Sequence, residues 1–325
     1  MKSKRAISIL LKIGIVAFAF FFLYEKLLLE SQKNEFNFNK IITNLKNSYF
    51  LLIIVFFMMF LNWSLEAFKW KFLISKIENI TFLRSIRAVF SGITVSAFTP
   101  NRIGEYGGRV FCLDKADRIQ AVFITIIGSM SQLLTTILFG SIGLLFLPEL
   151  MPDFLDSFSS INITYTIFFI LLFILNILLI ILFLNTPLLS NLLSSFNFLN
   201  KYHKYIKVFS YYSTLELFKV VLFSCARYIV FTTQFFILLN VFNVSIAYND
   251  AIVLIMTMLL AISIIPNIFP VLEVVNRSYI AALLFGLLST NISGIVSATF
   301  VLWAINLLLP AIIGSFFIFT LKFFR

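Results

Sequence analysis

Long apolar runs separated by short polar stretches dominate this chain. Six of the runs are long enough to cross a bilayer, because about 20 apolar helical residues span roughly 30 Å of hydrocarbon. These spans are predicted at 7–29, 48–68, 118–147, 161–185, 215–242 and 291–321. Two further apolar regions, 81–115 and 248–288, are each interrupted midway by proline and polar residues. The pattern predicts an all-α polytopic membrane protein with one integral membrane domain over residues 1–325.

Composition agrees with this pattern and excludes several kinds of chemistry. Of 325 residues, 61% are hydrophobic and 12% are charged, so a water-soluble fold could not bury the apolar surface. The chain has two cysteines and one histidine, which leaves little material for a disulfide framework, a metal site or a Ser-His triad. It has no phosphate-binding loop of the G-x-x-x-x-G-K-[ST] type. We expect no cofactor and no metal.

The charged residues predict how the chain is oriented in the membrane. Basic residues gather at the N-terminus, between the second and third spans, after the fourth span and at the C-terminus, whereas the loop "PELMPDFLDSFSSIN" has acidic residues and no Lys or Arg. Because basic loops stay in the cytoplasm, both termini are expected there, in a cytoplasmic membrane. The net charge of +11 is therefore explained by orientation, and no nucleic-acid partner is expected.

This orientation constrains the two interrupted regions. Basic residues on both sides of 88–113 are assigned to the cytoplasm, so that region must enter and leave the membrane by one face. Region 248–288 lies between two outer ends and must return to the outer face. Both regions are predicted to be re-entrant helical hairpins, one from each side of the membrane.

The tips of the two hairpins share a sequence pattern. Pro100-Asn101 is followed by Glu105 and Arg109, and Pro266-Asn267 is followed by Glu273 and Arg277. The prolines are 166 residues apart and the glutamates 168, about half of the chain. The pattern predicts an inverted-topology repeat of residues 1–147 and 161–325, with a substrate site between the halves. The alternative is that such short patterns recur by chance.

The first tip, "TPNRIGEYGGR", has the composition of an anion site. Charge inside a bilayer costs about 2.5–3.5 kcal/mol per residue, so intramembrane charges are usually paired or functional. Pro100 should end one helix, and a second helix should begin near Ile103 with its N–H groups free to bind an anion. The candidate substrate-binding residues here are Asn101, Arg102, Gly104, Glu105, Gly108 and Arg109. The alternative is a structural Glu105–Arg109 ion pair and a Gly-x-x-x-Gly packing motif.

Polar residues elsewhere in apolar segments complete the candidate site. Glu273 and Arg277 of the second tip are included, with Asn267 as a secondary candidate. Arg227 is expected to need a ligand or an acidic partner, for which Glu66, Glu105 and Glu273 are the candidates. Glu66, Gln132 and Gln234 are further secondary candidates. The small polar face of residues 128–136 is expected to make a helix–helix contact.

The segments "LNWSLEAFKWKFLI", "FTPNRIGEYGGR", "IIGSMSQLL" and "ARYIVFTTQFFILL", followed by a Pro…Glu…Arg tip, resemble the transmembrane domain of lysylphosphatidylglycerol synthases from about residue 48 to the end. The resemblance implies a domain that moves an aminoacylated phospholipid between leaflets. In full-length relatives a separate soluble C-terminal domain makes that lipid from aminoacyl-tRNA. This chain stops at Arg325, directly after a span, so by resemblance no synthase is expected. It also departs from the family at "VLEVV", where glycine commonly stands beside the glutamate.

We therefore expect a transporter or flippase for a lipid with an anionic head group: a phospholipid, an aminoacyl-phospholipid or a polyprenyl-phosphate lipid. One alternative is an integral membrane enzyme such as a glycosyltransferase acting on a lipid carrier, although the loops are short and carry no D-x-D-like pair. Another is a scaffold of lipid synthesis that does not itself transport. A homo-oligomer is compatible with each of these interpretations.

Overall fold

The structure is a computed structural model that describes residues 43, 45–150, 162–185, 188, 205, 207–265 and 270–319. Every regular element in these ranges is helical. The α-helices are α3 (Tyr49–Ile74), α4 (Phe82–Ser96), α5 (Gly104–Val110), α6 (Arg118–Phe146), α8 (Asn162–Leu184), α11 (Thr214–Val241), α12 (Tyr248–Ile264), α13 (Pro270–Phe285), α14 (Ile292–Trp303) and α15 (Leu309–Ile318). Two short turns matter for the site, namely η1 (Pro100–Arg102) and the π-helical η6 (Ala304–Leu308).

The predicted all-α membrane architecture is confirmed. Five helical segments are long and apolar enough to cross a membrane: Tyr49–Ile74, Arg118–Leu150, Thr166–Leu184, Thr214–Val241 and Ile292–Ile318. They match five of the six predicted spans, and the first predicted span, 7–29, lies outside the described residues. The chain is an integral membrane protein.

One boundary prediction was wrong, and it has a consequence for the site. The second span was expected to end at residue 68, with Lys69 as a flanking cytoplasmic charge, but α3 continues to Ile74. Lys69 therefore lies inside the helix, where its side chain is only 1% exposed. Lys69 pairs with Glu66 inside the protein, so its charge is not evidence for the orientation of the chain in the membrane.

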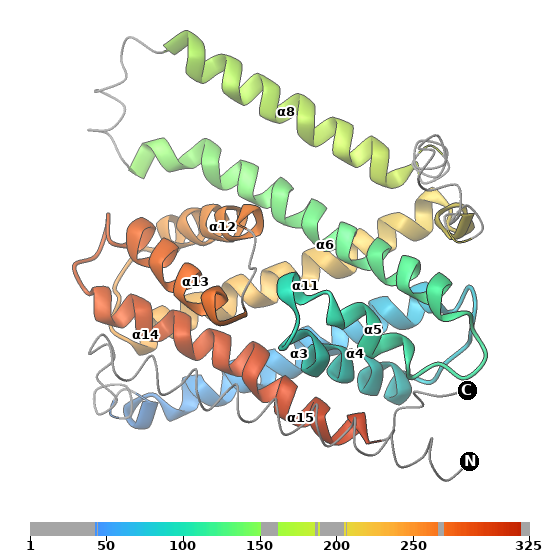
Figure 1. Ribbon diagram of the computed structural model, residues 1–325. Coiled ribbons are helices and arrows are strands. Elements are labelled where there is room, and N and C mark those ends of the chain that lie inside the picture. The colour runs from blue at the N-terminus through green and yellow to red at the C-terminus, as the bar shows by residue number, and fades with distance from the viewer. Residues whose placement is uncertain are drawn as a thin grey trace.

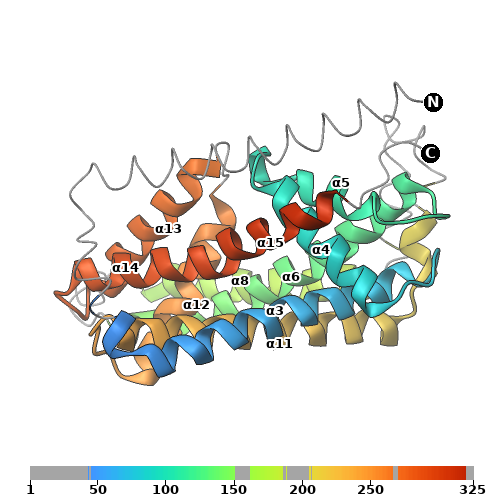
Figure 2. The same cartoon turned by 90° about the horizontal axis from the view of Figure 1, so that it is seen from below.

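The two interrupted regions each form a helix, a break and a second helix. In the first region, α4 and α5 flank η1, and in the second, α12 and α13 flank residues 265–269, of which 266–269 lie outside the described residues. Figure 2 shows α3 and α11 side by side along the length of the molecule. The α4–α5 and α12–α13 hairpins lie towards opposite ends of these long helices (Figure 1).

Small residues let the hairpins pack closely on their neighbours. A Cβ atom added to Gly108 of α5 would lie 2.6 Å from the Cα of Gly92 in α4. A Cβ on Gly314 of α15 would lie 2.1 Å from the carbonyl oxygen of Phe90 in α4, and one on Gly140 of α6 would meet α12. Each hairpin is thus held against a long helical segment from the other half of the chain, α4 on α15 and α12 on α6.

The last span is not a continuous α-helix, which the sequence analysis did not anticipate. A π-helical turn, η6, separates α14 from α15. Pro310 follows it and has no N–H to donate to the carbonyl oxygen of Asn306, four residues earlier, so the regular ladder cannot continue there. The turn lies level with the polar interior, and the Asn306 side chain bonds with groups on α3 and α11.

A carboxylate at the base of the first hairpin joins its two ends. Glu78, between α3 and α4, accepts backbone N–H groups from Asp114 (3.0 Å), Lys115 (2.7 Å) and Ala116 (2.8 Å), and pairs with Arg84 at 3.3 Å. Partial burial acts to raise the pKa of Glu78, but these donors outweigh it and hold the pKa below its ordinary value. The hairpin is therefore closed at its base by charge-assisted hydrogen bonds.

Helix α8 lies at the edge of the bundle beside α6 (Figure 1). Its most apolar window has a mean hydropathy of 3.4 and only 6% of its residues are buried in the protein. Its buried polar residue is Asn176, which donates to Ser141 on α6 at 2.8 Å. A helix that is apolar all round and exposed nearly everywhere is stable in lipid and not in water.

Candidate functional site

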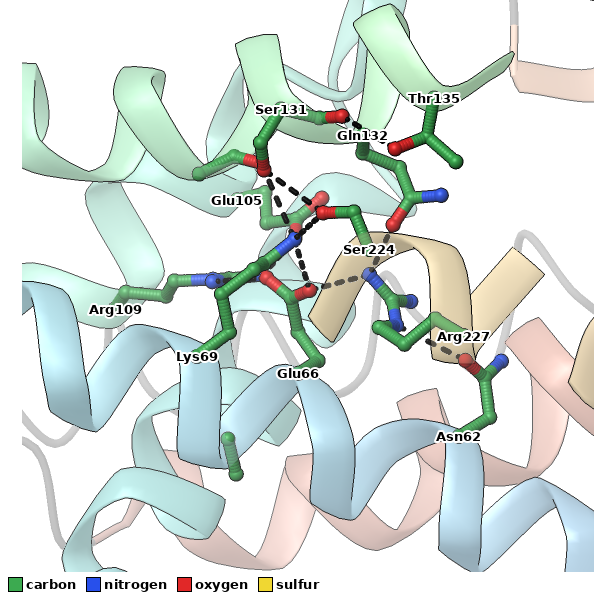
Figure 3. Close-up of polar contacts among 12 residues, drawn as sticks. Asn62, Glu66, Lys69, Glu105, Arg109, Ser131, Gln132, Thr135, Ser224 and Arg227 are labelled. Atoms are coloured by element: carbon green, nitrogen blue, oxygen red, sulfur yellow. Dashed lines mark hydrogen bonds and ion pairs between the residues drawn. The ribbon is translucent and has the colours of Figure 1, made fainter. Parts of the chain in front are cut away.

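Glu66 is the centre of the buried polar interior. It lies on α3, is 4% exposed, and its carboxylate meets three cations (Figure 3). Lys69 Nζ lies 2.8 Å from Oε2, Arg109 Nη1 lies 2.8 Å from Oε1, and Arg227 Nη1 contacts Oε2. These cations come from α3, α5 and α11. A single carboxylate therefore ties the first hairpin to the two central spans.

Arg109 is held between two carboxylates. Its Nη2 contacts Oε1 of Glu105 and its Nη1 contacts Glu66, and the side chain is 3% exposed. The predicted Glu105–Arg109 pair is thus confirmed. Glu105 is also approached by Arg102 Nη2, at 3.8 Å. With both terminal nitrogens occupied, Arg109 braces the tip from inside the protein.

Lys69 and the small polar face of α6 form the second part of the interior. Lys69 Nζ donates to the carbonyl oxygen of Gly128 at 3.1 Å and to Ser224 Oγ at 3.3 Å. Ser131 and Ser224 are joined by a hydrogen bond of 2.8 Å between their hydroxyls. The helix–helix contact predicted for residues 128–136 is therefore confirmed, with α11 as the partner of α6.

Arg227 contacts the polar interior on one side and borders a cavity, described below, on the other. Its Nε donates to Asn62 Oδ1 at 2.9 Å and its Nη1 to Gln132 Oε1 at 3.2 Å, and the guanidinium lies over the Trp63 ring, 5.2 Å from the centroid. The predicted need for an acidic partner is confirmed, and Glu66 is that partner. The second terminal nitrogen, Nη2, makes none of these contacts.

These ionised groups form what we call the charge cluster: Glu66, Glu105, Lys69, Arg102, Arg109 and Arg227. Four cations face two carboxylates, so its net charge is +2. An excess of positive charge is unfavourable in a low-dielectric membrane interior. The arrangement is electrostatically suited to an anion.

A cavity of about 590 Å³ opens next to the charge cluster. Its polar lining is Asn62, Asn101, Arg102, Gln132, Thr136, Arg227, Tyr228, Ser263, Glu273 and Arg277, and its apolar lining is Phe231, Leu259, Ile262, Ile264 and Ile265. Both hairpins contribute, because Arg102 lies on η1 and Arg277 on α13, and these two elements are in contact. Arg277 Nη2 pairs with Glu273 Oε1 at 3.0 Å.

The first tip reverses direction through two residues with positive φ. Asn101 has φ 48° and Arg102 has φ 59°, a left-handed conformation that costs energy for any residue with a Cβ. Below the turn, Thr99 Oγ1 accepts the Gly104 N–H at 2.7 Å. Helix α5 begins where expected but has seven residues, so the guanidinium groups, and not a helix dipole, supply the positive charge.

Three further predicted residues, Gly104, Gly108 and Gln234, do not line the cavity. Gly108 contacts Gly92 of α4, and a Cβ on Gly104 would lie 2.7 Å from Thr99 Oγ1 and from the Val95 carbonyl, so both glycines serve packing. Gln234 is fully buried and donates to the carbonyl oxygen of Val55 at 2.9 Å. Asn267 lies outside the described residues.

Several polar residues of this interior were not among the predicted site residues, including Asn62, Lys69, Tyr228 and Asn306. Lys69 could have been found from its position three residues after Glu66 on the same helical face. Asn306 accepts from Asn62 at 3.4 Å and donates to Gln234 at 2.9 Å, and an asparagine within the apolar segment "AINLLLP" is its only sequence signal. Tyr228 follows Arg227 and lines the cavity, but nothing in the sequence separates it from other membrane-facing tyrosines.

A comparison with protein families places this arrangement in a wider context. The family model described as Lysylphosphatidylglycerol synthase TM region matches residues 9–314. The matched range includes the charge cluster, both hairpins and every described helix except the last turn of α15. Neither a curated protein nor a solved structure matches the chain.

Proposed function

The chain belongs to the lysylphosphatidylglycerol synthase TM region family, and on this basis we propose that it moves a lipid with an anionic head group between the two leaflets of its membrane. The observation that carries the proposal is the cavity lined by three arginines from three elements: Arg102 on η1, Arg227 on α11 and Arg277 on α13. Guanidinium groups bind phosphate through paired hydrogen bonds, and a head group cannot enter hydrocarbon without replacements for its water.

Both ends of a lipid find suitable surroundings in this cavity. The arginines and amides make a polar wall, and side chains such as Phe231, Leu259 and Ile262 make an apolar one. A lipid presents the same division between head group and acyl chain. A soluble anion would gain nothing from the apolar wall, which favours an amphiphile as the occupant.

The cavity lies between two halves that are related as inverted repeats, over 1–147 and 161–325. Reciprocal packing supports this relation: α3 lies on α11, its counterpart in the second half, and α4 packs on α15 as α12 packs on α6. The hairpins lie towards opposite ends of the long helices (Figure 1). Alternating access would then follow from rocking one half against the other around the cavity.

The chemistry of the cavity favours transport over an enzymatic reaction. Glu273 is the one carboxylate among the described cavity-lining residues, and Arg277 neutralises it. A lipid-carrier glycosyltransferase needs a free carboxylate as base or metal ligand beside a donor-sugar pocket.

We place the protein in the cytoplasmic membrane with both termini inside, on the basis of its charged loops.

Leaflet exchange in liposomes tests the proposal. Protein reconstituted with fluorescently labelled anionic and zwitterionic phospholipids should exchange the anionic lipid faster than protein-free vesicles do. Arg102→Ala should slow that exchange by about tenfold or more, because one charge-assisted contact to phosphate is lost. Arg87→Ala, which removes an exposed arginine on α4 outside the cavity, is the matched control. Equal exchange by Arg102→Ala and unmodified protein would show that Arg102 does not hold the head group.

A further inference from the structure

We infer that the preferred lipid ends in a dianionic phosphomonoester, and not in a monoanionic phosphodiester head group. The inference rests on the proposed function and specifies its substrate class. Two independent features of the cavity support it, the net charge beside it and the number of donors that remain without a partner.

The first feature is the charge balance. The charge cluster has a net charge of +2, and the Glu273–Arg277 pair across the cavity adds none. A phosphodiester brings one negative charge and would leave an excess of +1 in the membrane interior. A phosphomonoester brings about two, because its second proton leaves near pH 6. The dianion is therefore the occupant that neutralises the site.

The second feature is the set of free donors. Arg102 Nε, Arg277 Nε and Tyr228 Oη are buried and have no hydrogen-bond partner among the described residues. All three residues line the cavity, and the Tyr228 side chain is only 3% exposed. Buried donors of this kind are normally satisfied, so they indicate a missing acceptor.

These donors approach from different elements, namely η1, α11 and α13. A phosphodiester has two free oxygens and is covered by ester groups on two sides. A terminal phosphate has three free oxygens and is covered on one side only, so it can be surrounded by three elements while its lipid chain leaves along the apolar wall. The geometry therefore fits the end of a chain better than a link within one.

The test compares two lipids that share their acyl chains. Liposomes containing the full chain receive labelled phosphatidic acid, a phosphomonoester, or labelled phosphatidylglycerol, a phosphodiester, at pH 8.5. Phosphatidic acid should exchange about tenfold faster or more, the effect of one further charged hydrogen bond. Lowering the pH to about 5.5 protonates phosphatidic acid to a monoanion and should abolish the preference, while phosphatidylglycerol, which does not titrate in this range, reports any effect on the protein itself.

Charge variants give a second readout. Arg102→Gln lowers the net charge to +1 and should reduce the preference for phosphatidic acid, whereas Lys219→Gln, an exposed charge on α11, should leave it unchanged. Arg102 lies at the cavity edge with 34% of its side chain exposed, so its replacement should disturb folding less than replacement of the buried Arg109. The melting temperature is also measured with inorganic phosphate, glycerol 3-phosphate or phosphatidic acid. A larger increase with phosphatidic acid is expected if the ligand is a lipid and not a soluble phosphate.

The outcomes separate the inference from the proposed function. Equal exchange of both lipids, or faster exchange of phosphatidylglycerol, overturns the inference and leaves anionic lipid transport intact. Exchange of neither lipid above the protein-free rate overturns both. Stabilisation by soluble phosphates as strong as that by phosphatidic acid overturns the lipid as the substrate. An unchanged preference in Arg102→Gln overturns the role of the charge balance.

Discussion

A single side chain, Glu66, holds together groups that are far apart in the sequence. Its carboxylate meets cations on three helices, 3, 43 and 161 residues away. Each of those cations would be costly in the membrane interior without a counter-charge. Glu66 therefore reduces the electrostatic cost of placing these cations in the interior. Glu66 does not line the cavity, but it holds in place the cations beside the cavity.

Replacing Glu66 should therefore destabilise the protein strongly. Glu66→Gln keeps the size and leaves Lys69 and Arg227 without their carboxylate, so the free energy of unfolding should fall by about 3–5 kcal/mol, as when one partner of a buried ion pair is removed. Thermal unfolding in detergent measures this. Glu149→Gln, which removes an exposed carboxylate, is the control. Equal melting temperatures for the two variants would contradict the assigned role.

At the scale of elements, close backbone contacts at glycines hold the first hairpin together and against its neighbours. Gly92 and Gly108 allow α4 and α5 to touch, and Gly314 brings α15 against α4. Helices in membranes associate through such close packing because lipid offers no hydrophobic driving force between them. The placement of Arg109 beside Glu66 follows from this contact, since a wider spacing between α4 and α5 would move α5 away from α3.

Two neighbouring glycines of α5 provide a matched comparison. A Cβ at Gly108 would lie 2.6 Å from the Gly92 Cα, whereas a Cβ at Gly107 meets no atom within 4 Å. Gly108→Ala should destabilise by about 1–3 kcal/mol through overpacking. Gly107→Ala should be neutral or stabilise by up to about 1 kcal/mol, because alanine favours helix. Unfolding in detergent compares them, and equal destabilisation by both changes would show that the α4–α5 contact is not tight.

At the scale of the whole molecule, the two hairpins are expected to open to opposite sides of the membrane. The base of the first hairpin lies in the basic loop around Lys115, and that of the second lies near Thr290. Both residues are exposed. The α4–α5 and α12–α13 hairpins lie towards opposite ends of α3 and α11, as an inverted pair requires (Figure 2).

Cysteine labelling in intact cells tests this arrangement. In a background where Cys112 and Cys225 are replaced by alanine, Thr290→Cys should react with a membrane-impermeant maleimide added outside. Lys115→Cys should react only after the membrane is permeabilised. If both positions are labelled from the same side, the two hairpins do not form an inverted pair, and the proposed mechanism of alternating access fails with it.

The amino-acid sequence alone was sufficient to predict the membrane class, five described spans, both helix breaks and the pairing of Glu105 with Arg109. These depend on local properties: hydrophobic run length, proline, and the four-residue spacing that places two side chains on one helical face. It also identified Arg227 as a cation in need of a carboxylate, because charge inside a lipid-facing segment is costly wherever its partner lies.

The packing of the helices was needed to learn which carboxylate pairs with Arg227 and that Lys69 faces the interior. It also places Arg109 inside the protein, while Arg102, Arg227 and Arg277 line one cavity. It also decided the π-helical turn that brings Asn306 to Asn62 and Gln234. These facts depend on how helices pack, and packing is set by contacts between residues up to 244 positions apart. Periodicity and spacing describe one helix at a time, so they reveal that a charge needs a partner but not which helix supplies it.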